Sequence, residues 1–342
     1  MRLEIAPRRL RLRTPLQTAH GTLAERELLD VLILGADGVA GAGEAAPLPS
    51  YDGVTLDDVR AALEDCRSIV HEAEGLPRAM VLAACRKAAV LPQAVAAIDL
   101  ALWDLEGRRA DVPVWRLLGA HPDPEPIAVN ALIAAEDRAG AAAEASRAVK
   151  DGFACVKLKV GIGDDAGRVA AVRAAVGPDV GIRLDANGAW EVDEALANLR
   201  ALTPSRIELV EEPVHGVEEL RAVAEEAAVP IAMDETAVAP GALESGATPI
   251  VCLKLSRCGG ITGLLDAAET VRADGGEVYL ASTLDGPLGI AGALHAAAVL
   301  RPARPCGLAT LAAFEGLELD PALQVERGVM RVPTAPGLGV RA

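Results

Sequence analysis

The stretch FACVKLKVG, residues 153–161, has the pattern of a short apolar β-strand that carries two lysines, Lys157 and Lys159. Because side chains alternate between the two faces of a strand, both lysines point to one face and the apolar residues to the other. A solvated lysine face is the more common arrangement for such a strand. If this face instead lies inside a barrel, two ammonium groups share a confined space and need anionic partners nearby.

From residue 127 onward, short apolar runs alternate with amphipathic, alanine-rich stretches. This alternation predicts a parallel sheet with crossover helices. Eight strands in about 200 residues favour a modified (β/α)8 barrel of the TIM type, an α/β fold, over an open doubly wound sheet. No GxGxxG motif follows the first strand, which also disfavours a dinucleotide-binding sheet. The predicted strands are 127–133, 154–160, 181–185, 206–211, 230–234, 250–254, 277–281 and 305–309. The predicted helices are 136–151, 166–176, 192–201, 217–228, 260–274 and 288–300, with a short or irregular segment at 235–248.

The first third of the chain has a different predicted order of strands and helices. Residues 2–13 and 28–36 have strand patterns, and the turn residues at 38–43 favour a meandering antiparallel sheet. Helices are predicted at 55–70, 77–89 and 93–105, and a proline-rich link follows them. We therefore expect three parts, namely an N-terminal α+β domain at 1–122, the barrel at 123–320, and a C-terminal segment at 321–342 that returns to the first domain.

Composition excludes several classes of function. The net charge of −16 disfavours nucleic acid and anionic membrane as partners, and no apolar run reaches the ~20 residues of a membrane span. The six cysteines form no CxxC pair, which disfavours a zinc ribbon or a disulfide framework. The basic N-terminus lacks the apolar core of a signal peptide, so we expect a cytoplasmic protein, and the apolar helices permit a homo-oligomer.

Ionisable residues stand at the carboxyl ends of five consecutive predicted strands. After the two lysines come Asp185, the pair Glu211–Glu212, Asp234 and Lys254. A barrel places these strand ends on one rim, where the active sites of this fold lie. Helix capping explains a single terminal aspartate, but it does not explain lysines in the same series. The series therefore predicts an active site, and the lysine face of 153–161 turns inward.

Three converging carboxylates repel one another unless a cation joins them. An all-oxygen set suits Mg²⁺, whereas zinc would want nitrogen or sulfur ligands. A lysine beside another cation has a lowered pKa and can act as a base near neutral pH. The predicted chemistry is abstraction of a proton next to a carboxylate, with Mg²⁺ stabilising the enediolate, as in enolase-type sites.

This pattern resembles the enolase superfamily, in its muconate-lactonizing-enzyme-like subgroup. The stretches GEAAPLPSYDG at 43–53 and AIDLALWDLEG at 97–107 look like the capping domain of that family, whose loops set substrate specificity. The motifs that carry the resemblance in the barrel are KLK at 157–159, DAN at 185–187, EEP at 211–213, DE at 234–235 and KLSRCGGI at 254–261.

The resemblance implies a role for each of these residues. Asp185, Glu211 and Asp234 are the expected ligands of Mg²⁺, or of Mn²⁺ in its place, and the resemblance alone selects Glu211 over its neighbour Glu212. Lys159 is the expected base, and Lys254 faces it across the substrate. Lys157 is expected to help hold the substrate carboxylate, while Asn187 and Glu235 are expected to support the metal ligands.

The subgroup includes o-succinylbenzoate synthases, N-succinylamino acid racemases, dipeptide epimerases and cycloisomerases. Dipeptide epimerases carry Asp-x-Asp at the end of the eighth strand, whereas CGLATLAAF at 306–314 has no acid before Glu315. The stretches at 281–300 and 305–310 look similar to o-succinylbenzoate synthases. Asp285–Gly286 departs from that pattern, because a Glu or Asp followed by Ser or Thr is more typical at this place. This resemblance implies a lyase that removes water from a cyclohexadiene carboxylate in menaquinone biosynthesis. An isomerase remains the alternative, either a racemase or epimerase that uses 1,1-proton transfer or a muconate-type cycloisomerase.

The substrate is expected to be a small carboxylate. Its pocket is predicted to include the loop at 18–22, and Arg183 lies on the same strand face as Asp185, where it meets either a substrate carboxylate or an ion-pair partner inside the barrel. The residues predicted to contact the substrate are Thr18, Tyr51, Lys157, Arg183, Ser282, Thr283 and Asp285.

Overall fold

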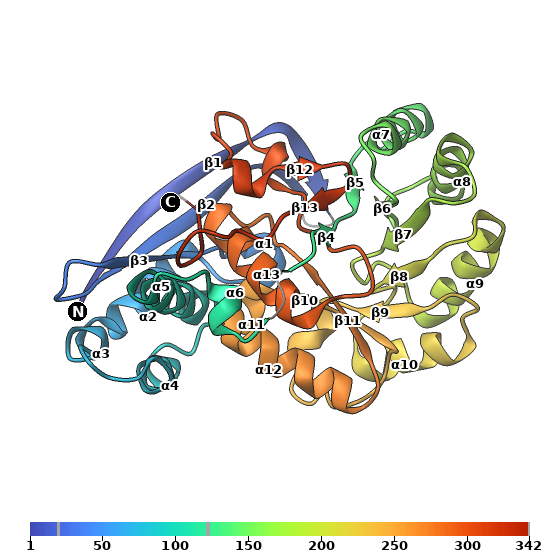
Figure 1. The fold of residues 1–342 in the computed structure, drawn as a ribbon. Coiled ribbons are helices and arrows are strands. Elements are labelled where there is room, and N and C mark those ends of the chain that lie inside the picture. The colour runs from blue at the N-terminus through green and yellow to red at the C-terminus, as the bar shows by residue number, and fades with distance from the viewer. Residues whose placement is uncertain (19–20, 121–123, 341–342) are drawn as a thin grey trace.

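The computed structural model describes residues 1–18, 21–120 and 124–340, apart from the side chains of residues 17, 18 and 21. Its centre is a curled parallel sheet in the order β11-β10-β9-β8-β7-β6-β5 (Figure 1). Neighbours in this sheet follow one another in the chain, as a (β/α) barrel requires. The strands are β5 (Ala131–Ile133), β6 (Cys155–Lys159), β7 (Gly181–Asp185), β8 (Leu209–Glu211), β9 (Ile231–Met233), β10 (Ile250–Lys254) and β11 (Glu277–Ala281).

Residues 306 and 307 lie between β11 and the segment that precedes β5, and they form single bridges with Val129 and Ala281. Cys306 N donates to Ala128 O at 2.7 Å, and Gly307 N donates to Leu280 O at 2.7 Å. The prediction of a full strand at 305–309 is therefore wrong, because only single bridges form on each side. Pro305 has no N–H to extend the ladder, which is one physical reason for the short pairing.

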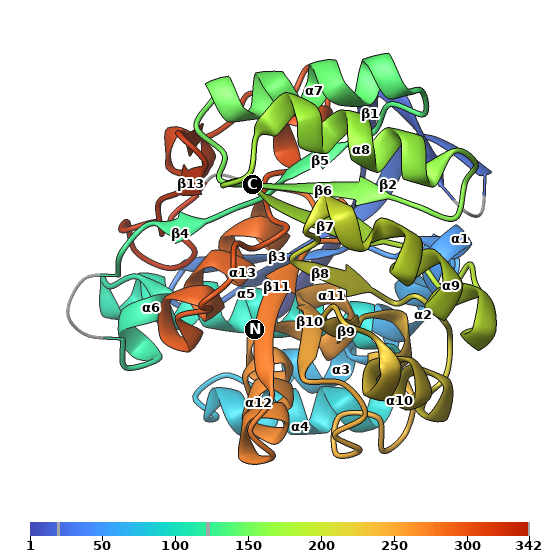
Figure 2. The ribbon, with the colours of Figure 1, turned by 90° about the vertical axis from the view of Figure 1, so that its right-hand side faces the viewer.

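Helices cover the outside of the sheet, and Figure 2 shows α7 to α10 ranged along the outer side of β6 to β9. In α9, Ala195, Leu196, Leu199 and Leu202 are buried, which is the spacing of one helix face. The segment after Asp234 contains only a short 3₁₀ helix (Glu235–Val238), in agreement with the irregular segment predicted there. The barrel helices are α7 (Arg138–Lys150), α8 (Asp165–Val176), α9 (Val192–Leu202), α10 (Val217–Glu226), α11 (Leu255–Cys258), α12 (Gly260–Ala273) and α13 (Pro287–Leu300).

The N-terminal part is an antiparallel sheet, β1-β2-β3, with helices packed on it. The strands are longer than predicted, and residues 40–45 form a strand where turn residues were expected. Gly41 and Gly43 explain this error, because a Cβ there would lie 2.1 and 2.0 Å from carbonyl oxygens of α5. These glycines allow a close approach of sheet and helix instead of making a turn. The elements are β1 (Arg2–Thr18), β2 (Gly21–Leu34), β3 (Ala40–Ala45), α1 (Pro49–Asp52), α2 (Leu56–Asp65), α3 (Arg67–His71), α4 (Arg78–Ala88), α5 (Pro92–Ala110) and α6 (Val114–Leu117).

The C-terminal segment contacts both parts of the molecule. Its strands β12 (Val325–Glu326) and β13 (Val329–Met330) pair with β4 (Ile127–Ala128), so the strand predicted at 127–133 is divided into β4 and β5. Beyond β13, Trp115 Nε1 donates to Pro333 O at 3.0 Å. Leu338 N donates to Asp104 Oδ1 at 2.7 Å. These bonds join the chain end to α5 and α6, and the exact domain boundaries remain a prediction.

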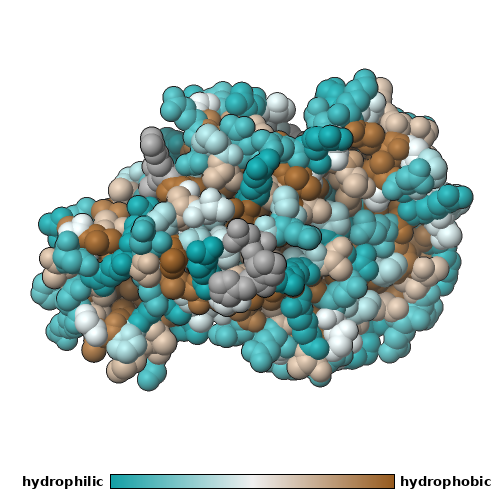
Figure 3. All heavy atoms as spheres, in the orientation of Figure 1, coloured by the Kyte–Doolittle hydropathy of each residue, from teal (hydrophilic) through white to brown (hydrophobic). Residues whose placement is uncertain are grey.

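Hydrophilic and hydrophobic residues are interspersed on the face of the molecule seen in Figure 3. Within the described ranges, no helix has both the length and the apolar character needed to cross a membrane.

Candidate active site

Strand β6 turns its two lysines toward the barrel interior, as the sequence predicts. Val156 and Leu158 are fully buried on the opposite face, where they join the core between the sheet and its helices. The strand register places Lys157 beside Arg183 and Lys159 beside Asp185. The two lysines therefore stand at successive levels of the interior, and Lys159 is the one at the carboxyl end of the strand.

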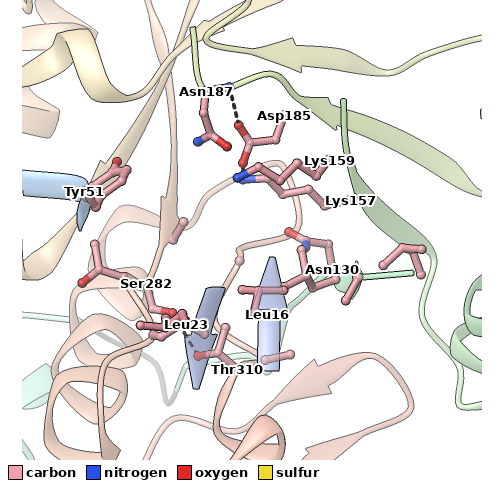
Figure 4. A pocket seen from close by; sticks show the side chains of 18 of the residues that line it. Leu16, Leu23, Tyr51, Asn130, Lys157, Lys159, Asp185, Asn187, Ser282 and Thr310 are labelled. Carbon is pink, nitrogen blue, oxygen red and sulfur yellow. Dashed lines mark hydrogen bonds and ion pairs between the residues drawn. The ribbon is translucent and has the colours of Figure 1, made fainter. Parts of the chain in front are cut away.

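Lys157 lies between two carboxylates. Its Nζ is 3.0 Å from Asp185 Oδ2 and is in direct contact with Glu211 Oε2. Burial lowers the pKa of Lys157, but Asp185 and Glu211 outweigh burial and raise this pKa well above its ordinary value. The ammonium group thus contacts two of the predicted metal ligands, and Lys157 also lines the pocket of Figure 4, as predicted for a residue near the substrate.

Lys254 is also held, by groups from both domains. Its Nζ donates to Asp234 Oδ2 and to Tyr51 Oη, and Tyr51 comes from α1 of the N-terminal part. Burial lowers the pKa of Lys254, but the carboxylate of Asp234 raises it well above its ordinary value. Lys254 is therefore a fixed cation in this arrangement.

Lys159 differs from the other two lysines. Among the described residues, no hydrogen bond or ion pair engages its ammonium group, and the side chain reaches the pocket shown in Figure 4. Burial lowers the pKa of Lys159, and the charges of Lys157 and Lys254 lower it further, against the opposing effect of Asp185. These are the properties of a lysine that can act as a general base.

The two glutamates after β8 point in different directions. Glu211 is buried and contacts Lys157 inside the barrel. Glu212 has a φ of 39°, and its carboxylate accepts hydrogen bonds from Asp234 N at 2.8 Å and from Thr236 N at 2.9 Å. Glu212 thereby ties the end of β8 to the end of β9, so Glu211 is left as the glutamate available to a cation.

Asn187 and Glu235 connect the loops that follow β7 and β9. Asn187 Nδ2 donates to Glu235 Oε1 at 2.7 Å, and Asn187 N donates to Asp185 Oδ1 at 3.2 Å. Burial, followed by the charge of Asp234, raises the pKa of Glu235 to about 8. This pair therefore braces the backbone that carries Asp185 and Asp234.

The donor set fits a hard divalent cation. Asp185 and Glu211 share one ammonium group, so their oxygens converge on a common region. Ligand atoms of Glu211 and Asp234 lie within 4.8 Å of each other. Three buried or partly buried carboxylates with no histidine among them match the oxygen ligands that Mg²⁺ prefers.

The walls of the pocket are mostly apolar. Leu16 and Leu23, which pair across β1 and β2, face the lysines from the side of the N-terminal sheet (Figure 4). Further apolar lining comes from Leu48, Ile133, Ile162, Leu284 and Ala309. Polar lining beyond the lysines and carboxylates includes Asn130 and the pair Ser282–Thr310, whose hydroxyl oxygens lie 2.9 Å apart.

Sequence reasoning missed Leu16, Leu23, Asn130 and Thr310, because none of them is a charged residue at a strand end. Tyr51, Ser282 and Thr283 do line the pocket as predicted. The side chain of Thr18 lies outside the described part of the structure.

Two residues predicted to contact the substrate do not line the pocket. Arg183 is fully buried, and its Nη2 lies 3.0 Å from Glu208 Oε1. It comes two residues before Asp185, about 6.6 Å further down the strand, so its side chain lies below the level of the pocket. This is the ion pair inside the barrel that the sequence analysis gave as the alternative to a substrate carboxylate. Asp285 is 1% exposed and accepts from Thr283 Oγ1 at 2.6 Å. The next residue, Gly286, donates its N–H to Glu44 at 2.6 Å, so the N-terminal sheet covers this segment.

Family profiles match nearly the whole chain. The profile described as "Mandelate racemase / muconate lactonizing enzyme, N-terminal domain" matches residues 1–119, and that described as "Enolase C-terminal domain-like" matches residues 140–342. The chain belongs to the enolase superfamily. The profile of its N-terminal domain makes this enolase-superfamily enzyme muconate-lactonizing-enzyme-like, as the motifs predicted.

This enolase-superfamily enzyme is similar to proteins of several activities. It is 30% identical to a hydrophobic dipeptide epimerase of Enterococcus faecalis, over 97% of this chain and 96% of the relative. It is 37% identical to the o-succinylbenzoate synthase of Thermobifida fusca, over 55% of this chain and 62% of the relative. A substrate-liganded L-Ala-D/L-Glu epimerase from Bacillus subtilis superimposes with a TM-score of 0.90 at 27% identity, covering 99% of this chain and 98% of that one.

Proposed function

We propose that this enolase-superfamily enzyme is a Mg²⁺-dependent dehydratase of the o-succinylbenzoate synthase type. It would remove a proton α to the carboxylate of a cyclohexadiene carboxylate and release water, giving an aromatic product for menaquinone biosynthesis. The observation that carries the proposal is the unequal state of the lysines, since none of the described residues bonds to the ammonium group of Lys159, whereas Lys254 is held by Asp234 and Tyr51. Dehydration needs one base and one fixed cation, whereas 1,1-proton transfer needs two lysines that exchange protons.

The residues then act as follows. The neutral amine of Lys159 takes the proton from the α-carbon, and the electron pair left on that carbon forms the new double bond as the hydroxyl group departs from the neighbouring carbon. The hydroxyl group takes up the proton that Lys159 has accepted and leaves as water, which returns Lys159 to the neutral amine. Lys254 stays protonated on the opposite side and stabilises the negative charge. Mg²⁺, held by Asp185, Glu211 and Asp234, would neutralise charge that develops on the substrate carboxylate.

The pocket wall formed by the segment predicted as the eighth strand favours a dehydratase over a dipeptide epimerase. Gly307 and Ala309 line the pocket there and offer no carboxylate to a substrate ammonium group. The surrounding leucines and isoleucines favour an apolar ring system over a strongly charged side chain.

A racemase or epimerase that acts on N-acylamino acids or hydrophobic dipeptides is the second candidate. Two observations favour it. The likeness to the dipeptide epimerase of E. faecalis extends over 97% of this chain. The exposed side chain of Glu136 also lines the pocket, where it could accept a substrate ammonium group.

One set of assays separates these candidates. Purified protein with Mg²⁺ is incubated with the cyclohexadiene carboxylate, and the aromatic product is followed by ultraviolet absorption. Parallel incubations in D₂O with N-succinylamino acids and hydrophobic dipeptides are followed by NMR for loss of the α-proton signal. We expect aromatic product from wild-type protein and none from Lys159→Ala. Rapid α-deuteration of an amino acid derivative without any aromatic product would overturn the dehydratase proposal.

A further inference from the structure

A buried amide faces the pocket without a hydrogen-bond partner. Asn130 lies between β4 and β5, and its backbone is fixed because Asn130 N donates to Cys306 O at 3.0 Å. The residue is only 5% exposed and lines the pocket, as Figure 4 shows. Among the described residues, none forms a hydrogen bond with its side-chain amide. Because buried amides in proteins are nearly always hydrogen-bonded, this one is available to a molecule in the pocket.

A pair of hydroxyl groups on the same wall also has an unused donor. Ser282 Oγ and Thr310 Oγ1 lie 2.9 Å apart, and both residues line the pocket. One hydroxyl group donates to the other, so the second O–H is left over, and no further described residue bonds to either side chain. Ser282 N donates to Gly307 O at 3.2 Å, next to the Cys306 carbonyl that binds Asn130. The amide and the hydroxyl pair are therefore attached to consecutive residues of one segment.

Gly307 leaves space beside the amide. Its φ is not positive, so the backbone conformation does not require glycine at this position. A Cβ there would lie 3.7 Å from Asn130 Oδ1 and 3.1 Å from Ala281 Cβ. The missing side chain thus keeps the approach to the amide open from the pocket, which Gly307 and Ala281 also line.

The fold places these groups across the barrel from the metal ligands. Asp185, Glu211 and Asp234 stand at the ends of β7, β8 and β9, the middle strands of the order β11-β10-β9-β8-β7-β6-β5. Ser282 follows β11 and Asn130 precedes β5, the two outer strands, which the segment at 306–307 adjoins. A substrate whose carboxylate reaches the metal ligands therefore extends its other end toward this wall.

We propose that Asn130 and the Ser282–Thr310 pair form a subsite that donates hydrogen bonds to the oxygen atoms of an acyl side chain on the substrate. The unused N–H and O–H groups suit oxygen acceptors. An ammonium group is disfavoured, because the cation of Lys157 lines the same pocket on the strand next to β5. The choice of an acyl chain rests on the proposed function, since o-succinylbenzoate carries a ketone and a second carboxylate on such a chain. Asn130 is then a residue that determines specificity and takes no part in proton transfer.

Ligand binding tests the subsite without any turnover. Isothermal titration calorimetry with Mg²⁺ present measures the Kd of o-succinylbenzoate and of benzoate, which has the same ring and carboxylate but no acyl chain. Wild-type protein is compared with Asn130→Ala and with Asn198→Ala, a control on α9 outside the pocket. We expect wild-type protein and the control to prefer o-succinylbenzoate. Asn130→Ala should bind o-succinylbenzoate at least about tenfold more weakly and benzoate within about twofold of wild-type protein.

A second variant tests the direction of the hydrogen bonds. Asn130→Asp keeps the shape of the side chain but replaces its N–H donors with acceptor oxygens and a negative charge. It should weaken o-succinylbenzoate more than Asn130→Ala does. Tighter binding of a hydrophobic dipeptide to Asn130→Asp, with unchanged binding of o-succinylbenzoate, would show that the subsite takes an ammonium group and would overturn the proposal.

Other outcomes are equally decisive. Equal weakening of o-succinylbenzoate and benzoate in Asn130→Ala, or a wild-type protein without preference for o-succinylbenzoate, also refutes the subsite. If circular dichroism shows that the Asn130 variants are unfolded, the double variant Ser282→Ala/Thr310→Val decides the matter, since a retained preference for o-succinylbenzoate contradicts the proposal and a lost one supports it. Failure of the proposed function is separate, because it appears as absence of aromatic product in the turnover assay while the effect of Asn130 on binding persists.

Discussion

A buried histidine far from the active site should make the stability of this protein depend on pH. His295 lies in α13 and is fully buried. Its Nδ1 accepts from Trp115 N at 3.2 Å, so Nε2 carries the proton and donates to Leu338 O at 3.1 Å. The neutral ring thus joins α13 to α6 and to the C-terminal segment. A second proton on Nδ1 would face the N–H of Trp115 and break this bond.

Burial lowers the pKa of His295 from 6.5 to about 4. The unfolded chain therefore binds a proton at this residue more readily than the folded chain does. The contribution to stability is complete above pH 6.5 and is lost as the pH falls toward 4. The linkage relation gives a loss of about 2 kcal/mol between neutral pH and pH 5, and about 3 kcal/mol in full. This is a substantial part of the ~5–15 kcal/mol that stabilises a typical protein.

Urea unfolding at about pH 7.5 and about pH 5 measures this effect. Wild-type protein is compared with His295→Gln, which does not titrate, and with His71→Gln, a control at an exposed histidine. Other titrating groups cancel in the comparison of variants. We expect wild-type protein and His71→Gln to lose about 2 kcal/mol more than His295→Gln between the two pH values. Equal losses in all three proteins would refute the reasoning, because His295 would then have the same pKa in both states.

Three further outcomes are expected. Lys159→Ala should lower kcat by at least about 10³-fold with little change in thermal stability, because this ammonium group makes no hydrogen bond or ion pair with the described residues. Activity assays and melting curves check both points. Chelation of divalent ions should abolish turnover, and added Mg²⁺ should restore it. The Asp185→Asn variant should need a higher Mg²⁺ concentration than wild-type protein for half-maximal activity. Equal Mg²⁺ requirements of the two proteins would contradict the assigned ligands. Gly43→Ala should destabilise the protein by about 1–3 kcal/mol or more in urea unfolding, because the new Cβ would lie 2.0 Å from Ala97 O; unchanged stability would contradict this packing.

Much of the fold follows from local patterns. The limits of β7, β10 and β11 agree with the predicted strands to the residue, because each is a short apolar run with a clear change of composition at both ends. The segment around residue 307 and the glycines of β3 were misjudged. In both cases pairing or close packing with a distant segment decides the conformation, and the local sequence carries no record of that partner.

The sequence alone determined the order of ionisable residues along the barrel rim, because consecutive parallel strands end on the same side and each contributes its last inward-facing side chain. That order placed Lys159, Asp185, Glu211, Asp234 and Lys254 together, and it turned the lysine face of 153–161 inward. Only the tertiary structure decided how these groups are engaged. Lys254 is held by Tyr51 from the N-terminal part, and Arg183 lies one level below the site. No described residue bonds to the ammonium group of Lys159. Such differences arise from contacts between segments up to 203 residues apart, which no local pattern encodes.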